Sequence, residues 1–125
     1  MAEPGLFHSI ARVNALKLFR AGRPDGERIV EFLDLAKRDV ARAAKVPKES
    51  VRYDLRMPEV LRVWFETIGA CIELVNSHFD DSDRTLLWFK TPNPLLGDVK
   101  PIDFVKMGRV RKLLAIIQSA LSDNS

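Results

Sequence analysis

Apolar residues recur at intervals of three and four along most of this chain, which is the spacing of one face of an α-helix. The recurring residues are mainly leucine, alanine and valine, interleaved with arginine and glutamate, and this composition favours helices over strands. The pattern therefore predicts an all-α protein. The expected helices cover residues 6–20, 27–35, 39–45, 48–56, 58–79, 82–90, a short segment from Pro101, and 109–121.

The longest expected helix covers residues 58–79, and Pro58 suits its first turn because the backbone donor that proline lacks has no partner there. Beyond its main apolar stripe, Val63, Phe65 and Leu74 add apolar positions on other faces. A helix of this kind either lies at the centre of a core or also forms an oligomer interface, and both interpretations stay open. The main stripe comprises Val60, Leu61, Trp64, Ile68, Cys71, Ile72 and Val75.

Turn-forming residues divide the chain into three regions, and 125 residues with 46% hydrophobic content suffice for one shared core. We expect a helix-turn-helix bundle in residues 1–57, a linking or dimerisation helix in 58–81, and a small three-helix module in 82–125. The lone Cys71 excludes an intramolecular disulfide. No apolar run approaches the roughly 20 residues that span a bilayer, so we expect a cytoplasmic protein with no membrane partner.

Residues 40–53 have the features of a helix-turn-helix core. Ala41 and Ala44 are small where two short helices would cross, and Lys45 lies at the turn position whose left-handed backbone usually selects glycine. The second helix, from Lys48, would leave its polar side chains free for a groove in DNA. Similar helix pairs occur in bundles that never bind DNA, which is the structural alternative. The candidate DNA-binding residues are Lys48, Ser50, Arg52, Tyr53 and Arg56.

Positive charge is concentrated around this helix pair. The formal net charge of +3 is too small to indicate a nucleic-acid partner by itself, but basic residues dominate positions 37–56 and acidic residues dominate 57–83. Such a basic segment is either an ordinary solvated surface or a source of phosphate contacts. The basic residues are Lys37, Arg38, Arg42, Lys45, Lys48, Arg52 and Arg56.

Proline and glycine corners join three short helices in residues 82–121. Trp88 is the expected anchor of their small core, since one large side chain can link helices too short to be stable alone. Asn93 is expected to hydrogen-bond backbone groups at its corner, and Asp103 to cap a helix or pair with a base. The motif residues are Trp88, Pro92, Asn93, Leu96, Pro101 and Asp103, with Leu87 and Leu95 expected in the same core.

These features give residues 88–114 a resemblance to the toxin-binding domain of MbcA/ParS/Xre antitoxins. The likeness is carried by a tryptophan near a helix end, a Pro-Asn-Pro corner, a Leu-Leu-Gly stop and a Lys-Pro-Ile-Asp restart. Residues 40–53 are similar to Xre-like helix-turn-helix proteins. The two halves occur in the order that the family shows, which strengthens the joint resemblance.

The resemblance implies that the chain is the antitoxin of a type II toxin-antitoxin system. Such an antitoxin binds and occludes a cognate RES-domain toxin that acts on NAD, and it regulates its own operon by binding operator DNA. A homodimer, or a larger hetero-oligomer with the toxin, is then expected. The implied toxin-binding residues are Arg109, Arg111, Lys112 and Gln118, for which a solvated helix face is the structural alternative.

Two other classes of protein stay open, a stand-alone helix-turn-helix repressor without a toxin and a helical adaptor. An enzyme is not expected, because His8 and His78 are isolated and the sequence contains no phosphate-binding glycine loop or nucleophile elbow. The carboxylates of Asp80, Asp81 and Asp83 have the pattern of helix capping. We therefore expect no catalytic residue, no metal and no cofactor.

Overall fold

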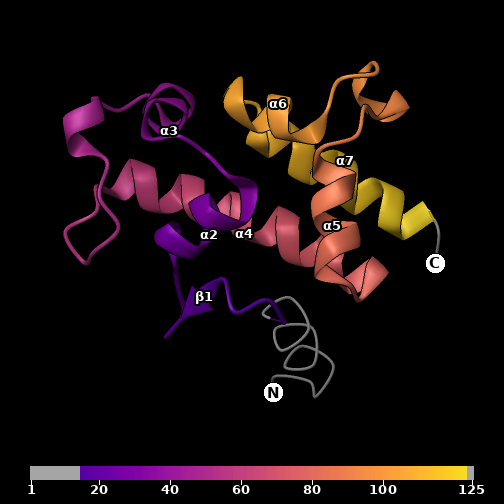
Figure 1. The fold of residues 1–125 in the computed structure, drawn as a ribbon, viewed down its shortest axis with the longest axis horizontal. Helices are drawn as coiled ribbons and strands as arrows, with labels where there is room; N and C mark the ends of the chain where they lie inside the picture. The colour runs from indigo at the N-terminus through magenta and orange to yellow at the C-terminus, as the bar shows by residue number, and fades with distance from the viewer. Residues whose placement is uncertain (1–14, 124–125) are drawn as a thin grey trace.

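The computed structural model describes residues 15–123, and this part of the chain is predominantly helical, with one small antiparallel hairpin (Figure 1). The all-α prediction is thereby confirmed. The helices are α2 Gly26–Leu33, α3 Lys37–Ala44, α4 Glu59–Phe79, α5 Ser82–Phe89, α6 Pro101–Lys106 and α7 Val110–Asp123. The shorter elements are the 3-10 helices η1 Lys48–Ser50 and η2 Pro94–Leu96 and the strands β1 Phe19–Arg20 and β2 Arg23–Pro24.

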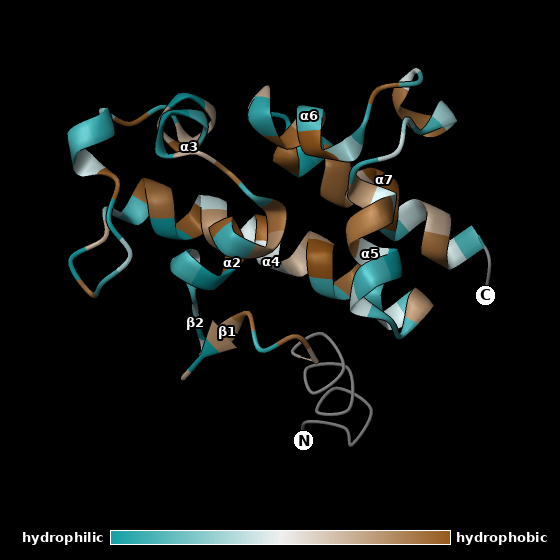
Figure 2. Ribbon diagram, viewed as in Figure 1, coloured by the Kyte–Doolittle hydropathy of each residue, from teal (hydrophilic) through white to brown (hydrophobic). Residues whose placement is uncertain are grey.

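Helix α4 runs through the middle of the molecule, with the amino-terminal elements around its first half and α5 and α7 against its second half (Figure 1). Apolar residues recur along its length, as the brown segments of the ribbon show (Figure 2). Phe65, Ile68 and Ile72 are completely buried. Burial also raises the pKa of the Cys71 thiol to about 12. These contacts support the central-core interpretation of this helix.

The helix expected over residues 6–20 is not found in the part that the structure describes. Residues 15–16 form a turn, Lys17 has a left-handed backbone with a φ of 58°, and Phe19 and Arg20 then pair with β2. Ala21 and Gly22 connect the strands with positive φ values of 53° and 77°, as a tight hairpin turn requires. Residues 6–14 of the expected helix lie outside the described residues. The spacing of apolar residues favours a helix here, but the observed conformation instead buries Leu18 in the core.

The hairpin approaches α4 closely at a glycine. A Cβ added to Gly69 would lie 2.9 Å from the Cζ atom of Phe19, a distance that real Cβ atoms do not show. Gly69 therefore provides the space in which the Phe19 ring packs. An aromatic side chain that fits such a gap gives this short hairpin a contact that its own few hydrogen bonds could not supply.

The helix expected over residues 48–56 is also wrong beyond its first turn. Only Lys48–Ser50 is helical, as η1; Val51 has an extended backbone, and residues 52–53 have no regular secondary structure. Val51 is buried and the Tyr53 ring packs edge-on against Phe65, with 5.8 Å between the ring centroids. In a continued helix, residues two positions apart point to nearly opposite sides, so the end of the helix at Ser50 is what allows both side chains to reach the core.

The carboxyl-terminal helices begin and end where local signals predict. The Asp81 side chain accepts a hydrogen bond from the Arg84 backbone N–H at 3.0 Å and so caps α5. Pro101 opens α6, and Gly108 lies between α6 and α7 with a φ of 77°. The last helix was expected over residues 109–121, and α7 extends two residues beyond that end, to Asp123.

Candidate functional site

Helices α2 and α3 are joined by a turn of three residues, Asp34, Leu35 and Ala36. Asp34 ends α2 in the left-handed conformation with a φ of 55°. The Ala36 backbone N–H donates to the Asp39 carboxylate at 3.1 Å, which fixes the start of α3. A short, tightly specified turn of this kind holds two helices in one relative orientation.

Helix α3 buries one side and exposes a basic one. Val40 and its neighbouring alanines are buried, whereas Lys37, Arg38 and Arg42 are exposed. None of these three cations forms an ion pair within residues 15–123. Lys45 closes the helix with a φ of 60°, the left-handed conformation that the sequence predicts there. The outer side of α3 is therefore an uncompensated cationic surface.

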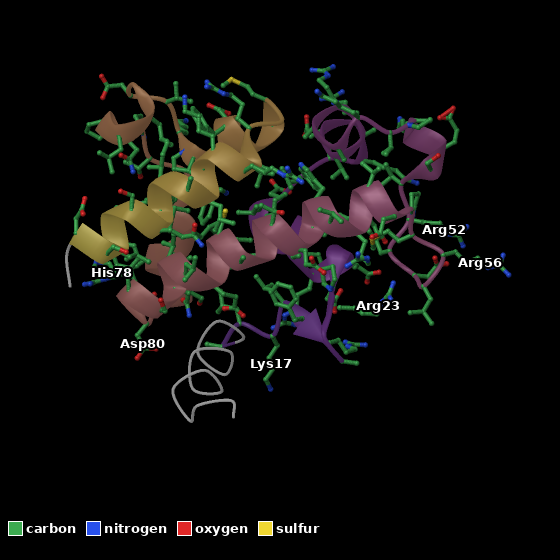
Figure 3. The ribbon with its side chains drawn as sticks, turned by 180° about the vertical axis from the view of Figure 1, so that it is seen from behind. Lys17, Arg23, Arg52, Arg56, His78 and Asp80 are labelled. Carbon is green, nitrogen blue, oxygen red and sulfur yellow. The ribbon has the colours of Figure 1, made fainter. Side chains whose placement is uncertain are left out.

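The five predicted DNA-binding residues do not share a helix face, because the helix that was to carry them is not formed. Lys48 and Arg56 are exposed and Ser50 is half-buried. Arg52 is held by the Asp54 carboxylate in two hydrogen bonds of 2.7 and 2.6 Å, which neutralise its charge locally. Tyr53 is half-buried against the core. Arg52 and Arg56 nevertheless project from the same end of the molecule (Figure 3).

The Pro-Asn-Pro corner is organised by Asn93, as predicted. The Asn93 side-chain oxygen accepts from the Leu95 backbone N–H at 2.9 Å, and the Asn93 backbone N–H donates to the Val99 carbonyl at 3.1 Å. Leu96 is buried at 6% exposure, but Leu95 is 63% exposed, so its expected place in the core is wrong. Pro92 lies exposed at the surface. The corner therefore presents Leu95 outward on a hydrogen-bonded frame.

Phe89, rather than Trp88, anchors the carboxyl-terminal helices. Phe89 is completely buried, whereas Trp88 is half-buried and packs against it edge-on at 5.1 Å between centroids. Trp88 instead lines a hollow of about 220 Å³, together with Phe79 and Leu95. Leu87, also expected in the core, is 65% exposed. The prediction of Trp88 as the anchor is therefore wrong by one residue.

The remaining motif residues lie at the start of α6. Pro101 is buried at the first helical position. Asp103 is exposed in the first turn, and its carboxylate makes neither the expected cap nor an ion pair within the described residues. Pro101 thus contributes to packing, while Asp103 contributes charge near a helix start, where the helix dipole favours an anion.

The four predicted toxin-binding residues lie along and beside α7. Arg111, Lys112 and Gln118 are exposed, opposite the side that buries Leu113 and Ile117. Arg111 and Gln118 are seven positions apart and therefore lie on one side of the helix. Arg109 precedes the helix, where its guanidinium carbon lies 4.7 Å from the centroid of the Phe104 ring. Three candidates thus share the solvent-facing side of α7, and Arg109 stands apart at the corner.

A groove separates the end of α3 from the start of α7, and its floor is formed by α4. We call it the α3–α7 groove; its volume is about 390 Å³. Gly108 brings the two walls together, since a Cβ there would lie 3.2 Å from the Ala43 carbonyl oxygen. The lining residues are Ala43, Ala44, Lys45, Glu59, Val60, Val63, Trp64, Thr67, Gly108, Val110 and Arg111.

Glu73 is a buried carboxylate that sequence reasoning missed. Its two oxygens accept from the Leu16 backbone N–H at 3.0 and 3.1 Å, and the Leu16 carbonyl accepts from Arg28 Nε at 2.9 Å. Burial raises the pKa of Glu73 to about 7, against the opposing effect of the backbone donors and Arg28. The sequence does contain a sign of this buried carboxylate, because Glu73 is flanked by Ile72 and Leu74. An acidic residue buried in an apolar stretch needs hydrogen-bond donors around it.

Within the described residues, no group of three or more histidine, cysteine, aspartate or glutamate side chains could hold a metal ion. His78 is exposed at the end of α4, and His8 lies outside the described part of the chain. No helix in residues 15–123 has the length and apolar character needed to cross a bilayer.

Comparison with known proteins identifies no relative of this chain. No protein-family model, curated protein or solved structure matches this chain significantly. Its function is therefore inferred from its own residues and their geometry.

Proposed function

We propose that this chain is the antitoxin of a type II toxin-antitoxin system. It binds and occludes a RES-domain toxin that acts on NAD, represses its own operon by binding DNA, and has no catalytic activity of its own. The observation that supports this most strongly is the motif in residues 88–114, which forms a corner hydrogen-bonded through Asn93. The protein acts in the cytoplasm, where both operator DNA and NAD are available.

Toxin binding uses the carboxyl-terminal module. Occlusion of an enzyme pocket requires a surface whose shape is fixed before binding, because ordering it on binding would cost affinity. Here α7 is packed on α4 and its outer side carries Arg111, Lys112 and Gln118. The proline corner adds the exposed Leu95 next to the half-buried Trp88. An apolar centre with a basic surround is a common composition for a protein interface.

DNA binding uses α3 rather than residues 48–56. The α2–α3 pair has the three-residue turn of a helix-turn-helix, in which the second helix enters the major groove. Lys37, Arg38 and Arg42 lie on its exposed side. Lys48 and Arg56, which are both exposed, contribute phosphate contacts, whereas Arg52 is engaged by Asp54.

Toxin binding and DNA binding are coupled through shared contacts. Gly108, which precedes α7, lies against Ala43 in α3, so the elements that carry the two proposed surfaces are in contact. A toxin that displaces this corner changes the position of α3, and the coupling acts equally in both directions. Helix-turn-helix proteins commonly bind paired half-sites as dimers, so a homodimer on the operator completes the proposal.

Co-expression with the product of the adjacent reading frame tests the toxin assignment. Expressed alone, that product should stop growth and deplete cellular NAD; together with this chain, it should be harmless and co-purify. An adjacent product that is harmless by itself and does not co-purify would contradict the assignment. The double variant Arg111→Glu, Gln118→Glu should lose co-purification, while Arg84→Glu on exposed α5 should retain it.

Electrophoretic mobility shifts with the chain's own promoter region test the DNA assignment. The wild-type protein should bind with an affinity that falls steeply as salt rises, because phosphate contacts release counterions. Arg38→Ala with Arg42→Ala should abolish the shift, while Arg84→Ala with Lys90→Ala should leave it unchanged. The basic α3 surface also fits a stand-alone repressor, which would bind the promoter but have no toxin partner.

A further inference from the structure

Beyond these two functions, we propose that the α3–α7 groove binds an acidic, amphipathic segment of a protein partner. The floor of the groove is apolar: Val60 is 58% exposed and lies beside Val63 and Trp64 on one side of α4. A contiguous apolar surface left open between two walls is a frequent feature of protein-binding sites. The concave shape calls for a convex occupant, such as one face of a helix.

The rim of the groove supplies positive charge. Lys45 from α3 and Arg111 from α7 line it, and neither forms an ion pair within residues 15–123. Glu59, its acidic lining residue, is already held by Arg62 at 2.6 Å. The adjoining residues 104–122 contain no aspartate or glutamate and include Lys106, Arg109 and Lys112. Acidic side chains on the occupant would therefore meet uncompensated cations on both sides.

The same features disfavour other occupants. DNA offers phosphate and sugar to a basic rim, but it has no apolar face to cover Val60 and Val63. A second copy of this chain would bring its own basic rim toward the first, and like charges at such an interface cost binding energy. The groove therefore fits an apolar face edged with carboxylates better than either of these.

Trp64 contributes to the floor of the groove. Its ring lines the groove, whereas its Nε1–H is buried without an acceptor among the described residues. An occupant would therefore cover the ring rather than reach the indole nitrogen, and the indole N–H signal would report on changes in the surroundings of this side chain.

Nuclear magnetic resonance with designed peptides tests the proposal without requiring a toxin. The probes are three amphipathic helical peptides of leucine combined with glutamate, glutamine or lysine. The chain has two tryptophans, so the indole N–H signals of Trp64 and Trp88 report separately on the groove and on the hollow beside the proline corner. The glutamate peptide should shift the Trp64 signal and bind about tenfold more tightly than the glutamine peptide, and weaken with salt.

Two variants in the groove and one outside it complete the test. Val60→Asp and, independently, Arg111→Glu should each weaken the glutamate peptide about tenfold or more. Leu87→Asp, at a residue of similar exposure on α5, should leave its affinity unchanged. Circular dichroism should show each variant folded, as expected for substitutions of exposed residues.

Several results would overturn the proposal. One is that the three peptides bind equally well, or that none binds. Another is that only the Trp88 signal shifts, and a third is that the Val60→Asp variant binds the glutamate peptide as tightly as the wild-type protein does. Light scattering that shows a dimer lost in Val60→Asp would assign the groove to a second copy, and a promoter duplex that shifts Trp64 would assign it to DNA. Failure of the toxin assignment is distinguishable, because it appears in co-expression while peptide binding is retained.

Discussion

The amino-terminal region, residues 15–58, and the carboxyl-terminal module, residues 82–123, are held in place by different kinds of contact. The first depends on residues far apart in sequence: Leu16 on Glu73, Phe19 over Gly69 and Tyr53 on Phe65. The second is specified largely by neighbours, through the Asp81 cap, the Asn93 corner and the Gly108 turn. Both regions pack on α4, and the second is also joined to it by the Thr85 hydroxyl, which donates to the Asn76 side-chain oxygen at 2.9 Å.

This difference has a consequence for function. A module built from local caps and turns keeps its shape when a partner binds, which suits the proposed toxin contact. A region whose backbone is set by distant contacts responds to changes on α4, because losing one of them releases a whole segment. When a partner binds elsewhere on the molecule, we therefore expect the resulting conformational change to occur in the amino-terminal region.

The largest expected effect comes from removing the anchor of the carboxyl-terminal module. Phe89→Ala should destabilise the protein by about 3–5 kcal/mol, because it empties a fully buried site between helices. Urea denaturation measures the loss, and hydrogen exchange should show it first in α5 and α6. Trp88→Ala is the matched control and should cost clearly less, since Trp88 is half-buried. Equal losses would restore Trp88 as an anchor.

The next effect concerns Glu73 and should depend on pH. Its pKa is raised by burial to about 7, so the folded protein holds this proton more tightly than the unfolded chain does. Its contribution to stability is complete below the ordinary carboxyl pKa and is lost as pH rises through about 7. The loss amounts to at most about 3 kcal/mol, measured as a decline in unfolding free energy between mildly acidic and mildly alkaline pH.

Glu73→Gln is the matched variant for this prediction. It keeps the shape of the side chain but cannot ionise, so its stability should lack the decline across this pH range. The Leu16 amide should exchange faster in this variant, because a Gln offers one acceptor oxygen where Glu offers two. A wild-type protein with equal stability at both ends of the range would show that Glu73 titrates normally.

A smaller effect is expected at the proline corner. Asn93→Ala removes the acceptor for the Leu95 N–H and should destabilise the protein by about 1 kcal/mol, the usual cost of losing a cap. Co-purification with a toxin should fall more than this figure suggests, because Leu95 loses its fixed position. Pro92→Ala, at an exposed residue of the same corner, should change neither property strongly.

The smallest effect should be a gain in the hairpin. Ala21 has a φ of 53°, which is unfavourable for alanine, and asparagine tolerates this conformation better. Ala21→Asn should therefore raise stability by about 0.5 kcal/mol, seen as a modest rise in Tm. The same substitution at Ala115, exposed on α7, should instead lower stability slightly, because asparagine is a poorer helix former than alanine.

The sequence predicted those elements whose boundaries are encoded by neighbouring residues. Asp81, Pro101 and Gly108 act within a few positions, so α5, α6 and α7 could be located in advance. Residues 48–56 could not, because Val51 and Tyr53 become buried by contacts with distant partners. The helix expected in residues 15–20 was wrong for the same reason, since this segment is also held by contacts with distant residues.

The candidate sites divide in the same way. Exposure of Arg111, Lys112 and Gln118 followed from the helical pattern of α7. The α3–α7 groove could not be predicted, because its walls come from three separate elements and meet only in the folded chain. Trp88 was predicted as the buried anchor, but Phe89 has that place. Adjacent helical residues point about 100° apart, so a small error in the predicted orientation of the helix is enough to select the wrong one of two neighbouring aromatic residues.

The burial of Cys71 has a practical consequence. It is the sole cysteine of the chain, and a thiol with a pKa of about 12 stays protonated and unreactive toward maleimides at neutral pH. A cysteine introduced at an exposed position would therefore be the one labelled, with the native residue left in place. Fluorophores or spin labels on the groove rim and on α3 could then follow the separation of the two surfaces without redesign of the core.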